Sequence, residues 1–159
     1  LIRRLNIQKN IIFEPNKFEK KIVDYLDIKL NLAYGRLNIL KKLSISKSNF
    51  ICNTNLNLLE LFPIASFNCV INSPDKKKLL KKLKINYKNR NKPIKINING
   101  NLNILNNKIN FDNIELNNNK LNKEDLKYYK STFENILFDK NFIQIFKLPK
   151  IQKFIAEIT

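Results

Sequence analysis

Basic side chains crowd one part of this chain. Ten lysine or arginine residues and no acidic residue fall between positions 76 and 95. These cations can neutralise phosphates, and the counterions released make binding favourable and sensitive to salt. Lysines acting as point charges suit folded RNA, which proteins recognise largely through its backbone and shape. The predicted RNA-binding residues are Lys76, Lys77, Lys78, Lys81, Lys82, Lys84, Lys88, Arg90 and Lys92. The alternative is a solvated lysine face, enlarged by the codon usage of an AT-rich genome.

Few residues that could support catalysis are present. The chain has no His, so the usual general base and metal ligand are missing. With only 2 Gly, no glycine-rich phosphate loop can be written. Asp24 and Asp27 form a conceivable carboxylate pair that nothing else supports. We therefore expect no enzyme activity, no catalytic residue, no cofactor, no metal and no small-molecule substrate.

The two cysteines, Cys52 and Cys69, stand in apolar, strand-like contexts with no CxxC motif or Cys/His cluster. A disulfide scaffold would need more cysteines. We expect both to act as small buried hydrophobic residues.

The overall charge points to an anionic partner. Formal net charge is +17, and a compact domain with that excess repels itself unless an anion neutralises it. Nucleic acid, an anionic membrane surface and an acidic protein are the candidates. No apolar run approaches the ~20 residues that span a bilayer, so membrane insertion is not expected. With 43% hydrophobic residues, the chain can bury a core.

The basic cluster is expected on a short helix. Ser73-Pro74 predicts a helix start, with Ser73 as the N-cap. In the following "DKKKLLKKLKI", three leucines share one stripe and lysines surround them: Leu79, Leu80 and Leu83.

The elements before this helix are expected in the order arm, strand, helix, strand, strand. Residues 1–19 are interpreted as a basic arm and 19–27 as a strand. Apolar spacing predicts an amphipathic helix at 28–43, with Asp27 as N-cap and Gly35 allowing close packing. Strands are expected at 44–53 and 67–71.

After the basic helix, apolar residues occur at every second position, as in a strand. Alternation at 94–105 around Asn99-Gly100 predicts a β-hairpin with a type I′ turn. Residues 108–116 are expected to add a strand, and 117–125 a polar loop. A helix at 132–147 and a strand at 153–158 are expected to close the chain.

Together these elements predict an α+β, ferredoxin-like fold. Two helices would cover a mostly antiparallel four-stranded sheet, and a β-hairpin segment would be inserted at about 97–131. Residues 20–159 would form a single domain. The inserted segment is interpreted either as a contact surface for neighbouring proteins or as an Asn-rich expansion packed on its own domain.

Residues in three parts of the chain also match the sequence pattern of one known protein family. "NCVINSPD" leads to Lys78 and Lys81, and "KNRNKPIKI" follows before the strand at 94–96. The family ends with a helix, a proline and a strand. These match "DKNFIQIFKLP" at 139–149 and "FIAEI" at 154–158. Asp27 and Leu30 match a first helix start. In these residues the chain resembles the small-subunit ribosomal protein S ten family (NusE in bacteria).

The resemblance implies a structural component of the ribosomal small-subunit head, bound to small-subunit ribosomal RNA and to neighbouring head proteins. Residues 49–75 contain no Lys or Arg, and the family's His after Ser-Pro is Asp75 here, so this loop is expected to contact protein. The Asn-, Lys- and Ile-rich composition and the absence of Met suggest an organelle genome, so a mitochondrial ribosome is expected, with a plastid-type organelle as alternative. The other interpretations are an accessory subunit of an organellar membrane complex and a non-ribosomal RNA-binding domain.

Overall fold

A computed structural model of the chain describes residues 4–14, 23–83, 91–106 and 108–138, without the side chains of 132–138. Ten elements follow one another in these residues. They are β1 (Asn6–Phe13), β2 (Tyr25–Ala33), β3 (Arg36–Ile45), β4 (Ser48–Asn57), β5 (Ile64–Ser73), α1 (Lys76–Lys82), β6 (Ile94–Asn103), β7 (Lys108–Leu116), β8 (Asn119–Lys120) and α2 (Lys123–Phe138).

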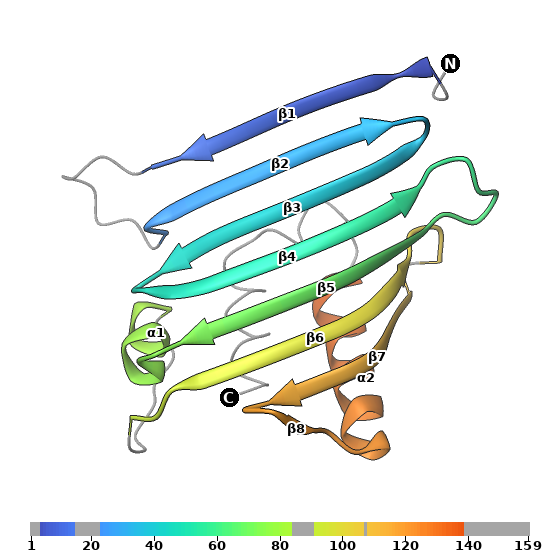
Figure 1. The fold of residues 1–159 in the computed structure, drawn as a ribbon. Coiled ribbons are helices and arrows are strands. Elements are labelled where there is room, and N and C mark those ends of the chain that lie inside the picture. Colours follow the sequence, from blue (N-terminus) through green and yellow to red (C-terminus); the bar gives the residue numbers. More distant parts are fainter. Residues whose placement is uncertain (1–3, 15–22, 84–90, 107, 139–159) are drawn as a thin grey trace.

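The strands form one open antiparallel sheet whose spatial order equals the chain order, from β1 to β8 (Figure 1). Each strand pairs with the next, as in an extended meander. The predicted ferredoxin-like fold with a four-stranded sheet is therefore wrong. The fold differs because apolar residues alternate with a period of two through most of the chain, and at 28–43 the same residues also fit a helical stripe.

The segment 28–43, expected as a helix, is a β-hairpin of β2 and β3. Its turn is Tyr34-Gly35, where φ is 50° and 76°, the positive values that two-residue hairpin turns require. Leucines that fit a helical stripe also alternate along the strands, so Leu30 opposes Ile39 on one face. Asp27 lies within β2 and caps no helix.

The predicted strand at 44–53 is also divided by a turn. Ser46 and Lys47 have φ of 51° and 66°, and they connect β3 to β4. A third such turn, Asn117-Asn118, connects β7 to β8 within the stretch expected as a polar loop.

The predicted hairpin at Asn99-Gly100 is wrong, because β6 runs straight through both residues. The register shifts there, with Asn99 opposite Asn113 and Gly100 opposite Phe111, so β7 bulges. A Cβ on Gly100 would meet the Asn110 carbonyl oxygen and lie 2.7 Å from Cζ of Phe67. The glycine therefore serves close packing within the sheet and forms no turn.

The short basic helix is confirmed, with one correction. It begins after Asp75, whose side chain accepts a 2.8 Å hydrogen bond from the Lys78 backbone N–H, so Asp75 and not Ser73 is the N-cap. The strand predicted at 108–116 is confirmed as β7.

The last helix begins earlier than predicted. α2 starts at Lys123 instead of 132, with Glu124 and Asp125 in its first turn. Its expected end at 147 and the expected strand at 153–158 lie outside the described residues.

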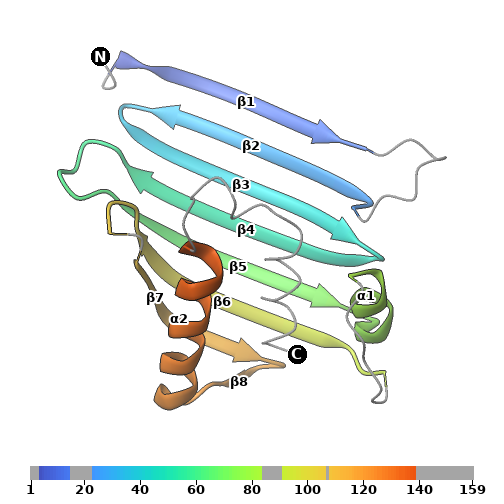
Figure 2. The ribbon, with the colours of Figure 1, turned by 180° about the vertical axis from the view of Figure 1, so that it is seen from behind.

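The main core lies between α2 and the strands β5 to β7. Its buried side chains are Ile71, Ile94, Ile96, Ile98, Ile109, Phe111 and Ile114, with Leu126 and Tyr129 of α2 packed against them. Figure 2 shows α2 on this side of the sheet, over β6 and β7. Residues 97–131, predicted as an insertion, thus supply part of the core, and 6–13 of the predicted arm form β1.

Candidate functional site

One face of the sheet is mostly apolar from β1 to β6, as the register shows. Opposed residues share a face, and the core residues of β6 connect row by row back to β1. Neither described helix lies over β1 to β3 (Figure 2). We call the apolar side chains of this part the open apolar face. They are Ile7, Ile11 and Phe13 of β1, Leu26, Ile28, Leu30 and Leu32 of β2, and Leu37, Ile39 and Leu43 of β3.

Burial on this face falls steadily toward β1. Ile96 and Ile98 in β6 are 2% and 3% exposed, whereas Ile7 and Ile11 are 41% and 52% exposed. The side chains of β2 and β3 that belong to the open apolar face are half-buried. A contiguous exposed apolar surface is uncommon in a water-soluble monomer and usually marks a binding surface.

Two lysines interrupt the open apolar face. Lys9 opposes Leu30, and Lys41 opposes Ile28. Burial lowers the pKa of Lys41, because the charged ammonium loses hydration among apolar side chains.

The predicted RNA-binding lysines are only partly grouped. Lys77, Lys78 and Lys81 are exposed on α1, while Lys76 and Lys82 are half-buried. Lys92 is exposed just before β6. Lys84, Lys88 and Arg90 lie outside the described residues.

The leucines of α1 fix its position at one end of the sheet. Leu79, Leu80 and Leu83 are 0–2% exposed. At the same end the Ser48 and Ser73 hydroxyls form a fully buried 2.8 Å hydrogen bond. Ser48 and Ser73 belong to the same face as the core residues, so α1 borders the apolar side of the sheet (Figure 2). The exposed lysines therefore stand at the end of the apolar surface.

The opposite face of the sheet is lined with amides. Asn38 donates to Asn53 at 3.2 Å, and the Ser66 hydroxyl donates to Asn101 at 2.8 Å. Hydrogen bonds from Asn97 and then Asn113 lower the pKa of Glu115 by stabilising its carboxylate.

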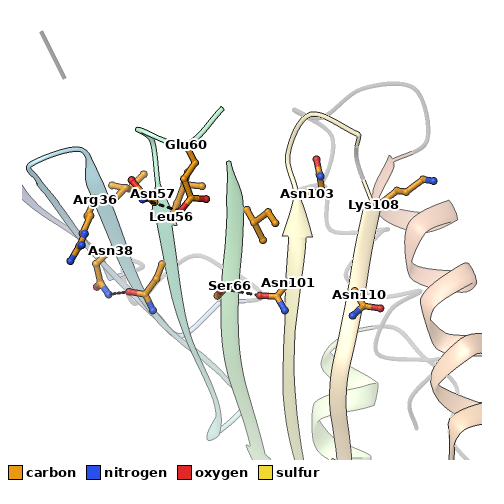
Figure 3. A pocket seen from close by; sticks show the side chains of 13 residues that line it. Arg36, Asn38, Leu56, Asn57, Glu60, Ser66, Asn101, Asn103, Lys108 and Asn110 are labelled. Carbon is orange, nitrogen blue, oxygen red and sulfur yellow. Dashed lines mark hydrogen bonds between the residues drawn. The ribbon is translucent and has the colours of Figure 1, made fainter. Parts of the chain in front are cut away.

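A shallow groove of about 840 Å³ lies at one end of the amide face (Figure 3). Arg36 and Lys108 stand on opposite sides of it, and Glu60 projects from the loop after β4. Its lining contains amides, hydroxyls and aliphatic groups, but no cysteine, histidine or aromatic ring. This composition offers hydrogen bonds, one carboxylate and two cations.

The cysteines are paired, against expectation. Cys52 and Cys69 oppose each other on β4 and β5, on the apolar side, and form a disulfide with a Cα–Cα distance of 4.0 Å. The sequence signal was present in outline, since two strands with one cysteine each flank a connecting segment. Only the strand register brings the two sulfurs together.

Asp27 is the one buried side chain of the described residues with an unpaired oxygen, Oδ1. It lies in β2 beside Tyr25, to whose hydroxyl it is hydrogen-bonded. Partial burial, and then the Asp27 and Glu14 carboxylates, raise the pKa of Tyr25. Asp24 is exposed and lies just before β2.

Among the residues that the structure describes, no group of His, Cys, Asp or Glu could hold a metal ion. In the same residues, no helix has the length and apolarity needed to cross a bilayer. Comparison of the chain with family models, with curated proteins and with solved structures finds no match.

Proposed function

We propose that the open apolar face binds the hydrocarbon chains of an anionic amphiphile, such as a phospholipid, while the lysines of α1 hold its headgroup. One observation carries this proposal. The apolar side chains of β1 to β3, exposed on β1 and half-buried on β2 and β3, line the side of the sheet at one end of which α1 carries exposed lysines. A purely protein partner would explain the apolar surface but needs no dense positive charge at its end.

The expected energies are adequate for binding. Each methylene that leaves water contributes about 0.8 kcal/mol. Each lysine near an anionic lipid surface contributes about 1 kcal/mol, and salt screens this part. The acyl chains would therefore supply most of the affinity, and α1 would favour anionic over neutral headgroups.

A second candidate is the structural role in a ribosomal small subunit that the sequence resemblance implies. The exposed Lys77, Lys78 and Lys81 and the net charge of +17 favour it. Ribosomal RNA and neighbouring head proteins would be its partners. It leaves the open apolar face to be covered by another protein of the assembly.

The disulfide is informative about the cellular compartment of the protein. Disulfides persist in oxidising compartments and are rare where thiol reductants are abundant. The Cys52–Cys69 bond therefore favours an oxidising compartment, while the mitochondrial or plastid-type location stays a prediction from composition.

Binding of two single-chain probes tests the first proposal. The probes are dodecyl phosphate and dodecyl maltoside, which share the same tail and differ in headgroup. Each is titrated by calorimetry below its critical micelle concentration. We expect dodecyl phosphate to bind at least tenfold more tightly at low salt. The triple variant Lys77→Gln, Lys78→Gln, Lys81→Gln should remove this difference and keep the tail-dependent affinity.

A change on the open apolar face separates the two candidates. Leu30→Asn should weaken dodecyl phosphate binding about tenfold or more, and the matched control Leu30→Met should not. Neither change should affect retention of small-subunit ribosomal RNA on a filter. If dodecyl phosphate does not bind, or binds Leu30→Asn as well as the native chain, the amphiphile proposal is refuted.

The ribosomal candidate has its own test. Replacing Lys78, Lys81 and Lys84 by Glu should prevent the chain from sedimenting with small subunits of an organelle lysate. A chain that sediments apart from the small-subunit peak at low salt, before any substitution, contradicts this candidate.

A further inference from the structure

Three connections lie together at the end of the sheet away from α1. They are the β2–β3 turn, the β4–β5 loop and the β6–β7 turn (Figure 1). The Leu58 N–H donates to the Gly35 carbonyl at 2.8 Å, and the Ile104 N–H donates to the Pro63 carbonyl at 3.4 Å. Leu59 packs against Gly35, since a Cβ there would lie 2.7 Å from Leu59 Cδ2. The three connections therefore form one continuous surface.

This end surface exposes large apolar and aromatic side chains. Leu61 and Phe62 in the β4–β5 loop are 89% and 67% exposed, and Tyr34 in the neighbouring turn is 77% exposed. Single exposed hydrophobic residues are ordinary, but a group of them on connected loops marks a contact with a protein or a membrane. We call this group the apolar tip. It consists of Tyr34, Leu59, Leu61, Phe62, Ile64 and Leu105.

Cations stand directly behind the apolar tip. Arg36 follows the β2–β3 turn, and Lys108 begins β7. Both are exposed, and they stand on opposite sides of the shallow groove of the amide face (Figure 3). The carboxylate that lines this groove, Glu60, accepts a 3.0 Å hydrogen bond from the Asn57 amide. Two cations against one carboxylate, with amide donors between them, suit the oxygens of an anionic group.

We propose that this end of the sheet docks on the surface of an anionic lipid bilayer. The apolar tip enters the boundary between headgroups and acyl chains, and Arg36 and Lys108 hold lipid phosphates. Burial of apolar side chains and attraction to anionic lipids add in such binding, and aromatic rings such as Phe62 are favoured at this boundary. A protein partner would cover the apolar tip equally well. The cations behind it match a surface whose negative charge lies next to its apolar layer.

Binding to vesicles tests the proposal. Vesicles of phosphatidylglycerol and phosphatidylcholine in equal parts are compared with vesicles of phosphatidylcholine alone, by co-sedimentation. The native protein should bind the anionic vesicles at least tenfold more tightly. The double variant Leu61→Ser, Phe62→Ser should weaken this binding at least tenfold and stay folded, because both side chains are exposed. The matched control Ile12→Ser removes a 57% exposed side chain from β1 and should bind as the native protein does.

Charge removal tests the cations separately. The double variant Arg36→Gln, Lys108→Gln should lose most of the preference for anionic vesicles. Its control is Lys29→Gln, Lys95→Gln, which removes the same charge from exposed positions of β2 and β6 and should keep the preference. Equal losses in the two double variants would show that net charge alone attracts the vesicles, and they would overturn the proposal.

The chain contains no Trp, so an introduced one reports the surroundings of the apolar tip. The fluorescence of Phe62→Trp should shift to shorter wavelength on anionic vesicles, and that of Ile12→Trp should not. An unshifted Phe62→Trp spectrum, or no binding of the native protein to anionic vesicles, overturns the proposal.

The apolar tip shares no residue with the open apolar face, so docking does not rest on the proposed function. Leu30→Asn, which should weaken dodecyl phosphate binding, should bind anionic vesicles as the native protein does. Loss of vesicle binding in Leu30→Asn would place the membrane contact on the open apolar face and refute docking through the tip. Failure of dodecyl phosphate to bind would refute the amphiphile proposal alone.

Discussion

Lys41 is one of two lysines on the open apolar face, and its lowered pKa means that the folded chain binds this proton more weakly than the unfolded chain. Unfolding therefore takes up a proton at pH values between the lowered pKa and the usual lysine pKa of 10.5. Folding stability attributable to Lys41 should rise as the pH increases through this window.

Replacing this lysine tests the assignment. Lys41→Met keeps the length of the side chain and removes the charge. We expect a stabilisation of less than about 1 kcal/mol at neutral pH, because the partly exposed ammonium keeps some of its hydration. The gain should shrink as the pH approaches 10.5. A gain that is the same at pH 7 and pH 10, measured by thermal unfolding, would show that hydration of the ammonium is not its cause.

Cys52 and Cys69 provide the second prediction at the scale of residues. The protein isolated without reductant should resist alkylation. After reduction, a thiol reagent should add two alkyl groups, which the mass of the intact protein measures. Cys52→Ser should leave Cys69 open to alkylation without any reductant. Full alkylation of the unreduced native chain would contradict the pairing.

At the scale of elements, β6 illustrates how a strand can carry a glycine. Gly100→Ala would place a methyl group against the Asn110 carbonyl and the Phe67 ring, so we expect a loss of about 1–3 kcal/mol in unfolding free energy. Asn99→Ala, on the polar face of the same strand, is the control and should cost less than 1 kcal/mol. Urea unfolding measures both. Equal losses would mean that the bulge region relaxes around the methyl group.

The same element explains a failed prediction. Asn-Gly is a strong hairpin signal, but a turn here would move Ile96 and Ile98 away from α2 and interrupt their ladder with β5 and β7. Burial of a whole strand contributes more than a local turn preference. α1 shows the opposite case, because its leucine stripe and its cap both lie within one short stretch.

At the scale of the whole molecule, burial is unequal along the sheet. The side chains of β5 to β7 pack under α2, whereas β1 is exposed along its length. We expect the backbone amides of β1 to exchange with solvent at least tenfold faster than those of β6. Hydrogen exchange in a dilute solution of the protein measures both rates. Uniform protection across the sheet would show instead that it opens as a single unit.

This gradient is the reason that the functional proposals lie at β1 to β3 and at α1. A covered core offers no surface to a partner. The part of the sheet without a described helix above it offers apolar side chains, and the basic helix at its border offers charge.

The sequence by itself determined what depends on neighbours in the chain. The break at Ser73-Pro74, the leucine stripe of α1 and the alternation of β7 were all predictable, because each follows from residues a few positions apart. Net charge and the absence of His likewise bounded the chemistry. Only the tertiary structure decided whether 28–43 is a helix or two strands, whether Asn99-Gly100 turns, and whether Cys52 meets Cys69. Each of these depends on contacts between strands, and their energy comes from burial on a shared face, which no local pattern contains.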